Sequence, residues 1–247
     1  MLNNTNSLKA PEVTLLFWII KVCITTLGET AGDTLSMSLG LGYLTSTIIF
    51  ACLFLLLVNV QVMYKKFNSY LYWSVIIATT TVGTTLADFV DRALNIGYLG
   101  GTSIIATLLS LSLIIWYYKE KEISINIFHN QRSEWFYWIT IVFSQTLGTA
   151  LGDWSADTIG LGFSNGILLF GSLIIVLATL NNYSFLSKTV LFWGTFILTR
   201  PFGAVLGDYL DKPIISGGLS LDRMYLSSGL FIIVILLVYV SNLRKAH

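Results

Sequence analysis

The chain has 247 residues, of which 55% are hydrophobic and only 11% are charged. Soluble domains usually carry about 25% charged residues, so this composition excludes an ordinary soluble domain. The formal net charge is +1, and the sequence has no basic patch, so we expect no nucleic-acid partner.

Apolar segments follow one another along the whole chain, each bounded by polar residues. A helix needs about 20 apolar residues to cross a bilayer, and a spanning segment must satisfy its own backbone hydrogen bonds. We therefore predict an all-α integral membrane protein, with residues 1–247 forming a single transmembrane domain in contact with the lipid bilayer. The eight predicted transmembrane helices cover residues 14–37, 41–64, 70–91, 98–118, 134–157, 161–181, 187–210 and 218–241.

The basic residues other than Lys21 and Arg200 favour one orientation. Nine of them lie in the termini or in loops after even-numbered segments, whereas three lie in loops on the opposite side. By the positive-inside rule, this distribution places both termini in the cytoplasm of a multi-pass protein. Residues 119–134 then form a cytoplasmic connector between two halves of the chain.

One motif, W-x9-G-x4-D-x8-G, occurs four times. Each copy covers two predicted helices, so all copies cross the membrane in the same direction and form parallel repeats. Successive copies are 55, 65 and 55 residues apart, which predicts pseudo-twofold and pseudo-fourfold symmetry about the membrane normal. The predicted repeats are residues 13–64, 68–118, 134–182 and 187–242.

This pattern resembles a bacterial family of membrane proteins built from four tandem two-helix repeats of unknown function, each marked by a tryptophan. The resemblance covers nearly the whole chain. It implies an eight-helix membrane fold in the bacterial inner (plasma) membrane, but it implies no activity.

Packing and anchoring explain part of the motif. Small residues four apart on a helix let two helices approach closely in lipid. We predict this role for Gly28, Gly32, Gly83, Gly148, Gly152, Gly203 and Gly207. Tryptophan rings suit the membrane–water interface, so we predict that Trp18, Trp73, Trp138 and Trp193 are interface anchors.

The motif aspartates are Asp33, Asp88, Asp153 and Asp208. Each stands fifteen residues after its tryptophan, or about 22 Å along a helix, which places it in the outer half of the bilayer. Each has a second carboxylate three or four residues away, namely Glu29, Asp91, Asp157 and Asp211. Charged groups within a membrane face a bundle interior or a water-filled cavity, and carboxylate rings favour cations. We predict these eight residues as cation-binding, with the four motif aspartates as metal ligands.

Oxygen ligands without histidine or cysteine favour hard ions such as Mn²⁺, Mg²⁺ or Ca²⁺. Three polar residues inside the predicted helices, Lys21, Gln145 and Arg200, are predicted to balance charge or to gate the site. We therefore predict a small secondary transporter or exporter of inorganic cations, with a divalent metal favoured.

This prediction includes no enzymatic activity and no tightly bound cofactor. A transported or bound divalent cation is the expected partner, and homo-oligomerisation is left open. The alternatives are a membrane-embedded metal-dependent enzyme acting on a lipid-linked substrate, a passive channel, and a structural membrane protein whose salt bridges hold the helix ends together.

Overall fold

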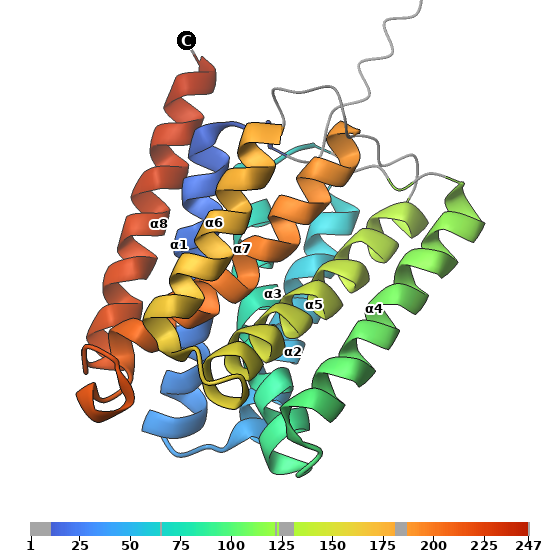
Figure 1. Ribbon diagram of the computed structural model, residues 1–247. Helices are drawn as coiled ribbons and strands as arrows, with labels where there is room; N and C mark the ends of the chain where they lie inside the picture. Colours follow the sequence, from blue (N-terminus) through green and yellow to red (C-terminus); the bar gives the residue numbers. More distant parts are fainter. Residues whose placement is uncertain (1–10, 65, 122, 124–130, 181–186, 247) are drawn as a thin grey trace, which may run out of the picture.

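The computed structural model describes residues 11–64, 66–121, 123, 131–180 and 187–246 (Figure 1). Within them the chain is helical and contains no strand, so the predicted all-α class is confirmed. Half of the predicted connector 119–134, namely residues 122 and 124–130, lies outside the described residues. The helices are α1 Leu15–Asp33, α2 Tyr43–Met63, α3 Ser69–Asp88, α4 Gly97–Glu120, α5 Gln131–Asp153, α6 Gly162–Leu180, α7 Lys188–Asp211 and α8 Arg223–Ala246.

Seven of these eight helices are long and apolar enough to cross a membrane, judged over the described residues. The exception is α5, which carries charged residues in its first turn and several buried polar side chains farther along. The prediction for α8 is least accurate, because this helix begins at Arg223 and not at residue 218. Left-handed backbone conformations at Gly217 and Ser220 delay its start.

The odd-numbered helices form the centre of the bundle. Helix α1 packs against α3, α3 against α5, α5 against α7, and α7 against α1, so the four helices close a ring. Each even-numbered helix packs on the odd-numbered helix of the following repeat, and α8 closes the set by packing on α1. The repeats are therefore interlocked, and the even-numbered helices expose most of the large apolar side chains.

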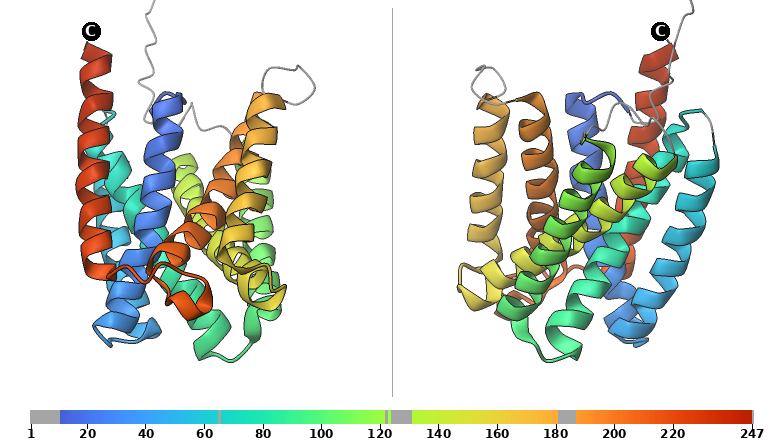
Figure 2. Two further views of the ribbon diagram at one scale, coloured as in Figure 1. Left: turned by 60° about the vertical axis from the view of Figure 1, so that its left-hand side comes forward. Right: turned by 90° about the vertical axis from the view of Figure 1, so that its right-hand side faces the viewer.

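The bundle has two different ends (Figure 2). Helix α1 starts and α8 finishes at one end, which we call the terminal end. The opposite end, which we call the hairpin end, holds the turns within each repeat. The last motif glycine has a positive φ in every turn, at Gly42, Gly97, Gly162 and Gly217, which explains why glycine stands there.

In the first three repeats, a single wide turn follows the motif aspartate: η1 Thr34–Ser38, η2 Phe89–Ala93 and η3 Trp154–Thr158. Each contains a hydrogen bond from a backbone N–H to the carbonyl five residues earlier, for example Leu39 N to Thr34 O at 2.9 Å. Such π turns are rare and occur often at functional sites. The fourth repeat differs, because α7 continues normally to Asp211 and the short 3₁₀ turn η4 Ile214–Ser216 follows.

The first motif glycine of each repeat lies where two central helices meet. A Cβ atom on Gly83 would lie 2.9 Å from the backbone carbon of Gln145, so α3 and α5 could not approach this closely with any larger residue. Each glycine faces the residue three positions before the glycine of the next repeat, and the pattern closes around the ring. The four facing pairs are Gly28 with Thr80, Gly83 with Gln145, Gly148 with Arg200, and Gly203 with Thr25.

Aromatic side chains close the centre of the ring near the terminal end. Each motif tryptophan packs against the aromatic residue that precedes the tryptophan of a neighbouring repeat, with ring centroids 5.2 to 6.2 Å apart. Tyr72 and Tyr137 also share a hydrogen bond of 2.8 Å between their hydroxyls. The contacts are Phe17 with Trp73, Tyr72 with Trp138, Tyr137 with Trp193, and Phe192 with Trp18.

Candidate functional site

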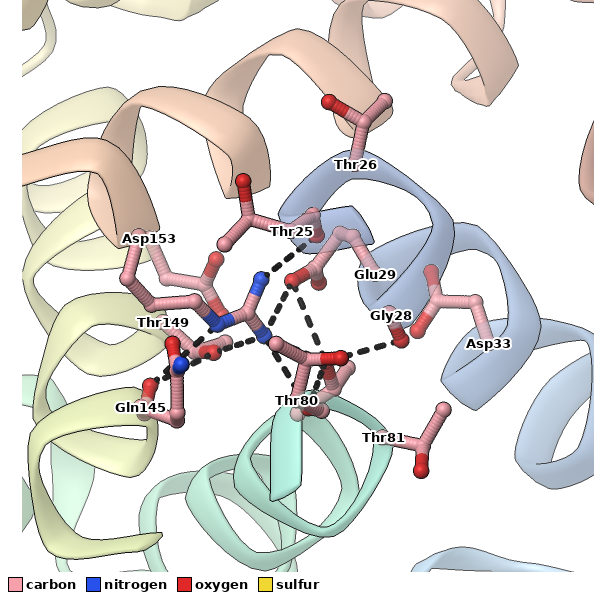
Figure 3. Close-up of polar contacts among 12 residues, drawn as sticks. Thr25, Thr26, Gly28, Glu29, Asp33, Thr80, Thr81, Gln145, Thr149 and Asp153 are labelled. Atoms are coloured by element: carbon pink, nitrogen blue, oxygen red, sulfur yellow. Dashed lines mark hydrogen bonds and ion pairs between the residues drawn. The ribbon is translucent and has the colours of Figure 1, made fainter. Parts of the chain in front are cut away.

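Arg200 lies at the centre of the ring and is fully buried. It extends from α7, and its guanidinium group contacts all three other central helices. Nη1 donates to the carbonyl oxygen of Thr25 at 2.9 Å, and Nε donates to the carbonyl oxygen of Gln145 at 3.3 Å. A third carbonyl, that of Thr80, lies 3.4 Å from Nη2. The residues around this group converge from α1, α3 and α5 (Figure 3).

The next layer towards the hairpin end holds the residues that directly follow the motif glycines. Glu29 forms an ion pair with Arg200, with Oε2 3.1 Å from Nη2. The hydroxyls of Thr84 and Thr149 also accept hydrogen bonds from Nη2. Thr84 donates in turn to the carbonyl oxygen of Gly28 at 3.1 Å, so the layer is tied to the helix backbones.

The four motif aspartates are buried in a layer nearer the hairpin end. They are joined in pairs by two cations from the second and fourth repeats. Arg92 contacts Asp88 of its own repeat at 3.1 Å and Asp153 of the third repeat at 3.0 Å. Lys212 contacts Asp208 of its own repeat at 3.1 Å and Asp33 of the first repeat at 2.5 Å.

Lys212 lies just beyond the end of α7. Burial disfavours its charged form, but the neighbouring Asp208 and Asp33 outweigh burial and hold the pKa of Lys212 above its ordinary value. The ammonium group is therefore a stable counter-ion for these two aspartates.

The remaining predicted carboxylates have different surroundings. Asp211 pairs with Arg223, whose Nε lies 2.6 Å from Oδ2, and the same arginine approaches Asp33 at 3.8 Å. Asp91 is buried, and neither of its oxygens has a hydrogen-bond partner among the described residues. Asp157 is exposed and accepts a hydrogen bond from Tyr98 at 2.8 Å, so the structure does not bring it into the buried network.

The buried network carries an excess of negative charge. Its ion pairs join six carboxylates to four cations among the described residues, which leaves a formal excess of two negative charges when all groups are ionised. Three of the carboxylates, Glu29, Asp33 and Asp208, place one oxygen each within 4.8 Å of the others. One oxygen of Asp33, Oδ1, is buried without a hydrogen-bond partner in the described part of the chain.

The two other predicted gating residues lie close to Arg200. Gln145 presents its backbone carbonyl to the guanidinium group, whereas its side-chain amide is buried and has no hydrogen-bond partner among the described residues. Lys21 is fully buried, and its ammonium group lies 4.1 Å from the centre of the Phe196 ring. The ammonium group thus lies inside the bundle and has no hydrogen-bond partner in the described residues.

Two of the four motif tryptophans lie differently from the prediction. Trp73 and Trp138 are buried against other aromatic rings inside the bundle, so their rings do not lie on its outer surface. An anchoring role for the half-buried Trp18 and Trp193 stays a prediction. The threonine and backbone oxygens around Arg200 are functional groups that were not predicted from the sequence. The signal for them in the sequence is that Gln145 and Arg200 stand at the same position of their repeats, three residues before the first motif glycine. The direction of a backbone carbonyl cannot be inferred from the type of residue.

The chain belongs to the family described as Repeat of Unknown Function (DUF347), which matches residues 16–67, 71–122, 136–184 and 191–246. The predicted resemblance to a family with four repeats of unknown function is therefore confirmed. No curated protein and no solved structure matches the chain.

Proposed function

We propose that the protein is a small membrane transporter of inorganic cations, with a hard divalent ion as the favoured substrate. The observation that carries this proposal is that the ion pairs of the network join six buried carboxylates to only four cations among the described residues, a formal excess of two negative charges. Unpaired charge within a membrane is expensive, so it marks ion pathways more often than structural sites. One divalent cation, or two monovalent ions or protons, balances this charge.

We place the ion at the cluster of Glu29, Asp33 and Asp208, whose oxygens lie within 4.8 Å of one another. Two oxygens that bind one Ca²⁺ lie at most about 5 Å apart, and two that bind Mg²⁺ lie at most about 4.2 Å apart. The spacing therefore suits a Ca²⁺-sized ion directly, and a smaller ion after a slight inward movement. Carboxylate oxygens also match the preference of such ions for hard ligands.

We also propose how the protein spans the membrane. All eight helices, including the more polar α5, cross the bilayer of a bacterial inner membrane, and both termini lie in the cytoplasm. The ring of central helices surrounds an axis along the membrane normal. The cyclic contacts of the motif glycines support pseudo-fourfold symmetry about this axis. The 120-residue offset between the bridging cations Arg92 and Lys212 supports pseudo-twofold symmetry.

Ion flux through the purified protein tests the proposal. Liposomes that contain the protein and enclose a dye quenched by Mn²⁺ should show quenching when Mn²⁺ is added outside. Asp33→Asn should abolish this flux because it removes a charge from the three-carboxylate cluster. Asp222→Asn is the matched control, since Asp222 is exposed at the hairpin end and its side chain caps α8 through the amides of Met224 and Tyr225.

Equal flux in the wild-type protein and in a folded Asp33→Asn variant would show that the ion does not pass through the cluster of Glu29, Asp33 and Asp208. Absence of flux for Mn²⁺, Ca²⁺, Mg²⁺, Na⁺ and protons in the wild-type protein would refute transport itself.

A structural membrane protein is the second candidate. The observation in its favour is that every motif aspartate already has a cationic partner. In this case Asp33→Asn should lower thermal stability, and added metal should not change the stability of the wild-type protein. Stabilisation of the wild-type protein by Mn²⁺ that disappears in the variant favours the transporter.

A further inference from the structure

The guanidinium group of Arg200 is surrounded by more oxygens than its hydrogens require. Nη2 carries two hydrogens but lies within hydrogen-bond distance of four oxygens, those of Glu29, Thr80, Thr84 and Thr149. Nη1 and Nε have one carbonyl partner each. Because four oxygens share two hydrogens, they are gathered around a positive charge and not around individual N–H directions.

These oxygens have the composition of a cation-coordination shell. They comprise three backbone carbonyls, two hydroxyls and one carboxylate. Carbonyl, hydroxyl and carboxylate oxygens are the ligands of hard cations such as Ca²⁺, and rings of carbonyls replace the hydration shell of ions in selective pores. The six oxygens come from three helices, so they surround the charge from several sides.

The position of Arg200 in the repeat supports the same interpretation. The three carbonyls belong to Thr25, Thr80 and Gln145, which each stand three residues before the first motif glycine. Arg200 holds this same position in the fourth repeat. Three repeats thus direct the same backbone carbonyl towards the centre, and the fourth repeat supplies the cation that fills the space.

We propose that these six oxygens form a second cation site at the centre of the ring, and that Arg200 is a tethered substitute for the cation that binds there. The proposal rests on the proposed transport function and adds a gate to it. A cation that leaves the cluster of Glu29, Asp33 and Asp208 towards the terminal end enters the oxygen cage only when the guanidinium group moves out. Glu29 belongs to both sites and passes the ion between them.

The backbone beside Arg200 is suited to such a movement. Pro201 follows directly and lies inside α7. Proline has no N–H, so the carbonyl four residues earlier loses its helical hydrogen bond, and the helix bends easily at this point. A hinge next to Arg200 lets the side chain move without unfolding α7.

Replacement of Arg200 by a neutral residue tests the cage. In the Arg200→Gln variant the six oxygens lose their cation, so an added metal ion should occupy the cage and stabilise the protein. We expect Mn²⁺ or Ca²⁺ to raise the unfolding temperature of this variant, with an apparent dissociation constant at least about tenfold lower than in the wild-type protein. Removing a positive charge about 4 Å from the ion accounts for an effect of this size.

Lys21→Met is the matched control. It also removes a buried positive charge near the centre, but the ammonium group of Lys21 contacts a phenylalanine ring and not an oxygen cage. Its apparent metal affinity should therefore stay within about threefold of the wild-type value. Adding Glu29→Gln to the Arg200→Gln variant should cancel the gain, because this removes the only carboxylate among the six cage oxygens.

Arg200→Met keeps the test informative when Arg200→Gln does not fold. A methionine side chain keeps an unbranched apolar stem but carries no charge, so we expect a gain in metal affinity in the same direction. A folded Arg200→Gln variant, or failing that a folded Arg200→Met variant, that binds metal no better than the wild-type protein would overturn the proposal.

The outcomes for the two sites are separable. Flux that depends on Asp33, without a gain in affinity at position 200, would leave the transporter standing and refute the cage. A gain in affinity in a protein without flux would support the cage and refute transport.

Discussion

Because α3 approaches α5 closely at Gly83, we predict that a glycine-to-alanine substitution there lowers the stability of the protein, although the same substitution in a helix usually raises it. In the middle of a helix, replacing glycine by alanine normally stabilises a protein by about 0.5–1 kcal/mol, because alanine restricts the unfolded chain and favours the helix. At Gly83 the added methyl group would lie 2.9 Å from the backbone carbon of Gln145 and 3.0 Å from the backbone nitrogen of Thr146. Neither atom can turn away as a side chain could.

The cost follows from this geometry. Nonbonded carbon atoms rest at about 3.5–4.0 Å, so α3 and α5 would have to separate by roughly 0.5–1 Å along most of their contact. Inserting a methylene-sized group into a packed core costs about 1–3 kcal/mol, and the upper part of this range applies where the neighbour is backbone. Gly229 in α8 is the matched control, because a Cβ atom there would have no heavy atom within 4 Å.

The gain in helix propensity is the same at both positions, so the difference between the two variants measures the steric cost. We expect Gly83→Ala to be less stable than Gly229→Ala by about 2–3 kcal/mol. For a chain of this size, that corresponds to a difference of roughly 4–12 °C in unfolding temperature. Thermal unfolding in detergent micelles, followed by circular dichroism, measures the difference. An increase of similar size in both variants would refute the close contact between α3 and α5.

Two further predictions concern the hairpin end. Arg92→Met should destabilise the protein by about 3–5 kcal/mol because it leaves Asp88 and Asp153 buried without their cation. Adding Asp153→Asn should recover part of this loss, and a double-mutant cycle of unfolding free energies measures the recovery. Gly217 has φ 86° and ψ 12°, close to the left-handed helical region that asparagine tolerates, whereas Gly42 has φ 75° and ψ 164°, a conformation open only to glycine. Gly217→Asn should therefore cost less stability than Gly42→Asn. Equal unfolding temperatures for the two variants would contradict this prediction.

The sequence predicts those features that depend on residue type and spacing. Runs of apolar residues indicate the helices, and small residues four apart indicate close packing, because both properties act locally along one helix. The sequence does not predict which repeat supplies each partner. Arg92 stands beside Asp91 in the chain, yet it pairs with Asp88 and Asp153, and the second of these contacts exists only because the ring brings α5 next to η2.

The motif tryptophans show a second limit of what the sequence can predict. An indole ring is amphipathic, so it suits a membrane interface and a packed interior equally well, and its position near a helix start does not decide between them. In the fold, Trp73 packs on Phe17 and is buried. Phe17 is the residue directly before the tryptophan of the neighbouring repeat, and it becomes visible as a partner of Trp73 only when the order of helices around the ring is known.

Some structural features occur in all four repeats and others in only one or two. This difference distinguishes the residues that pack the helices from the residues that could bind an ion. The glycine contacts, the aromatic contacts and the positive φ of the last motif glycine each occur in all four repeats. The bridging cation occurs twice, as Arg92 and Lys212. The pair of Glu29 and Arg200 occurs once.

Packing needs the same small or aromatic residue at every equivalent position, since each pair of neighbouring helices meets in the same way. A site on the central axis is different, because one charge placed there faces all four repeats at once. A single arginine is enough to occupy three inward-facing carbonyls, and a second one would meet the first at the axis and repel it. Glu29 and Arg200, which both break the repeat and pair at its centre, are therefore where the chemistry of this protein should be sought first.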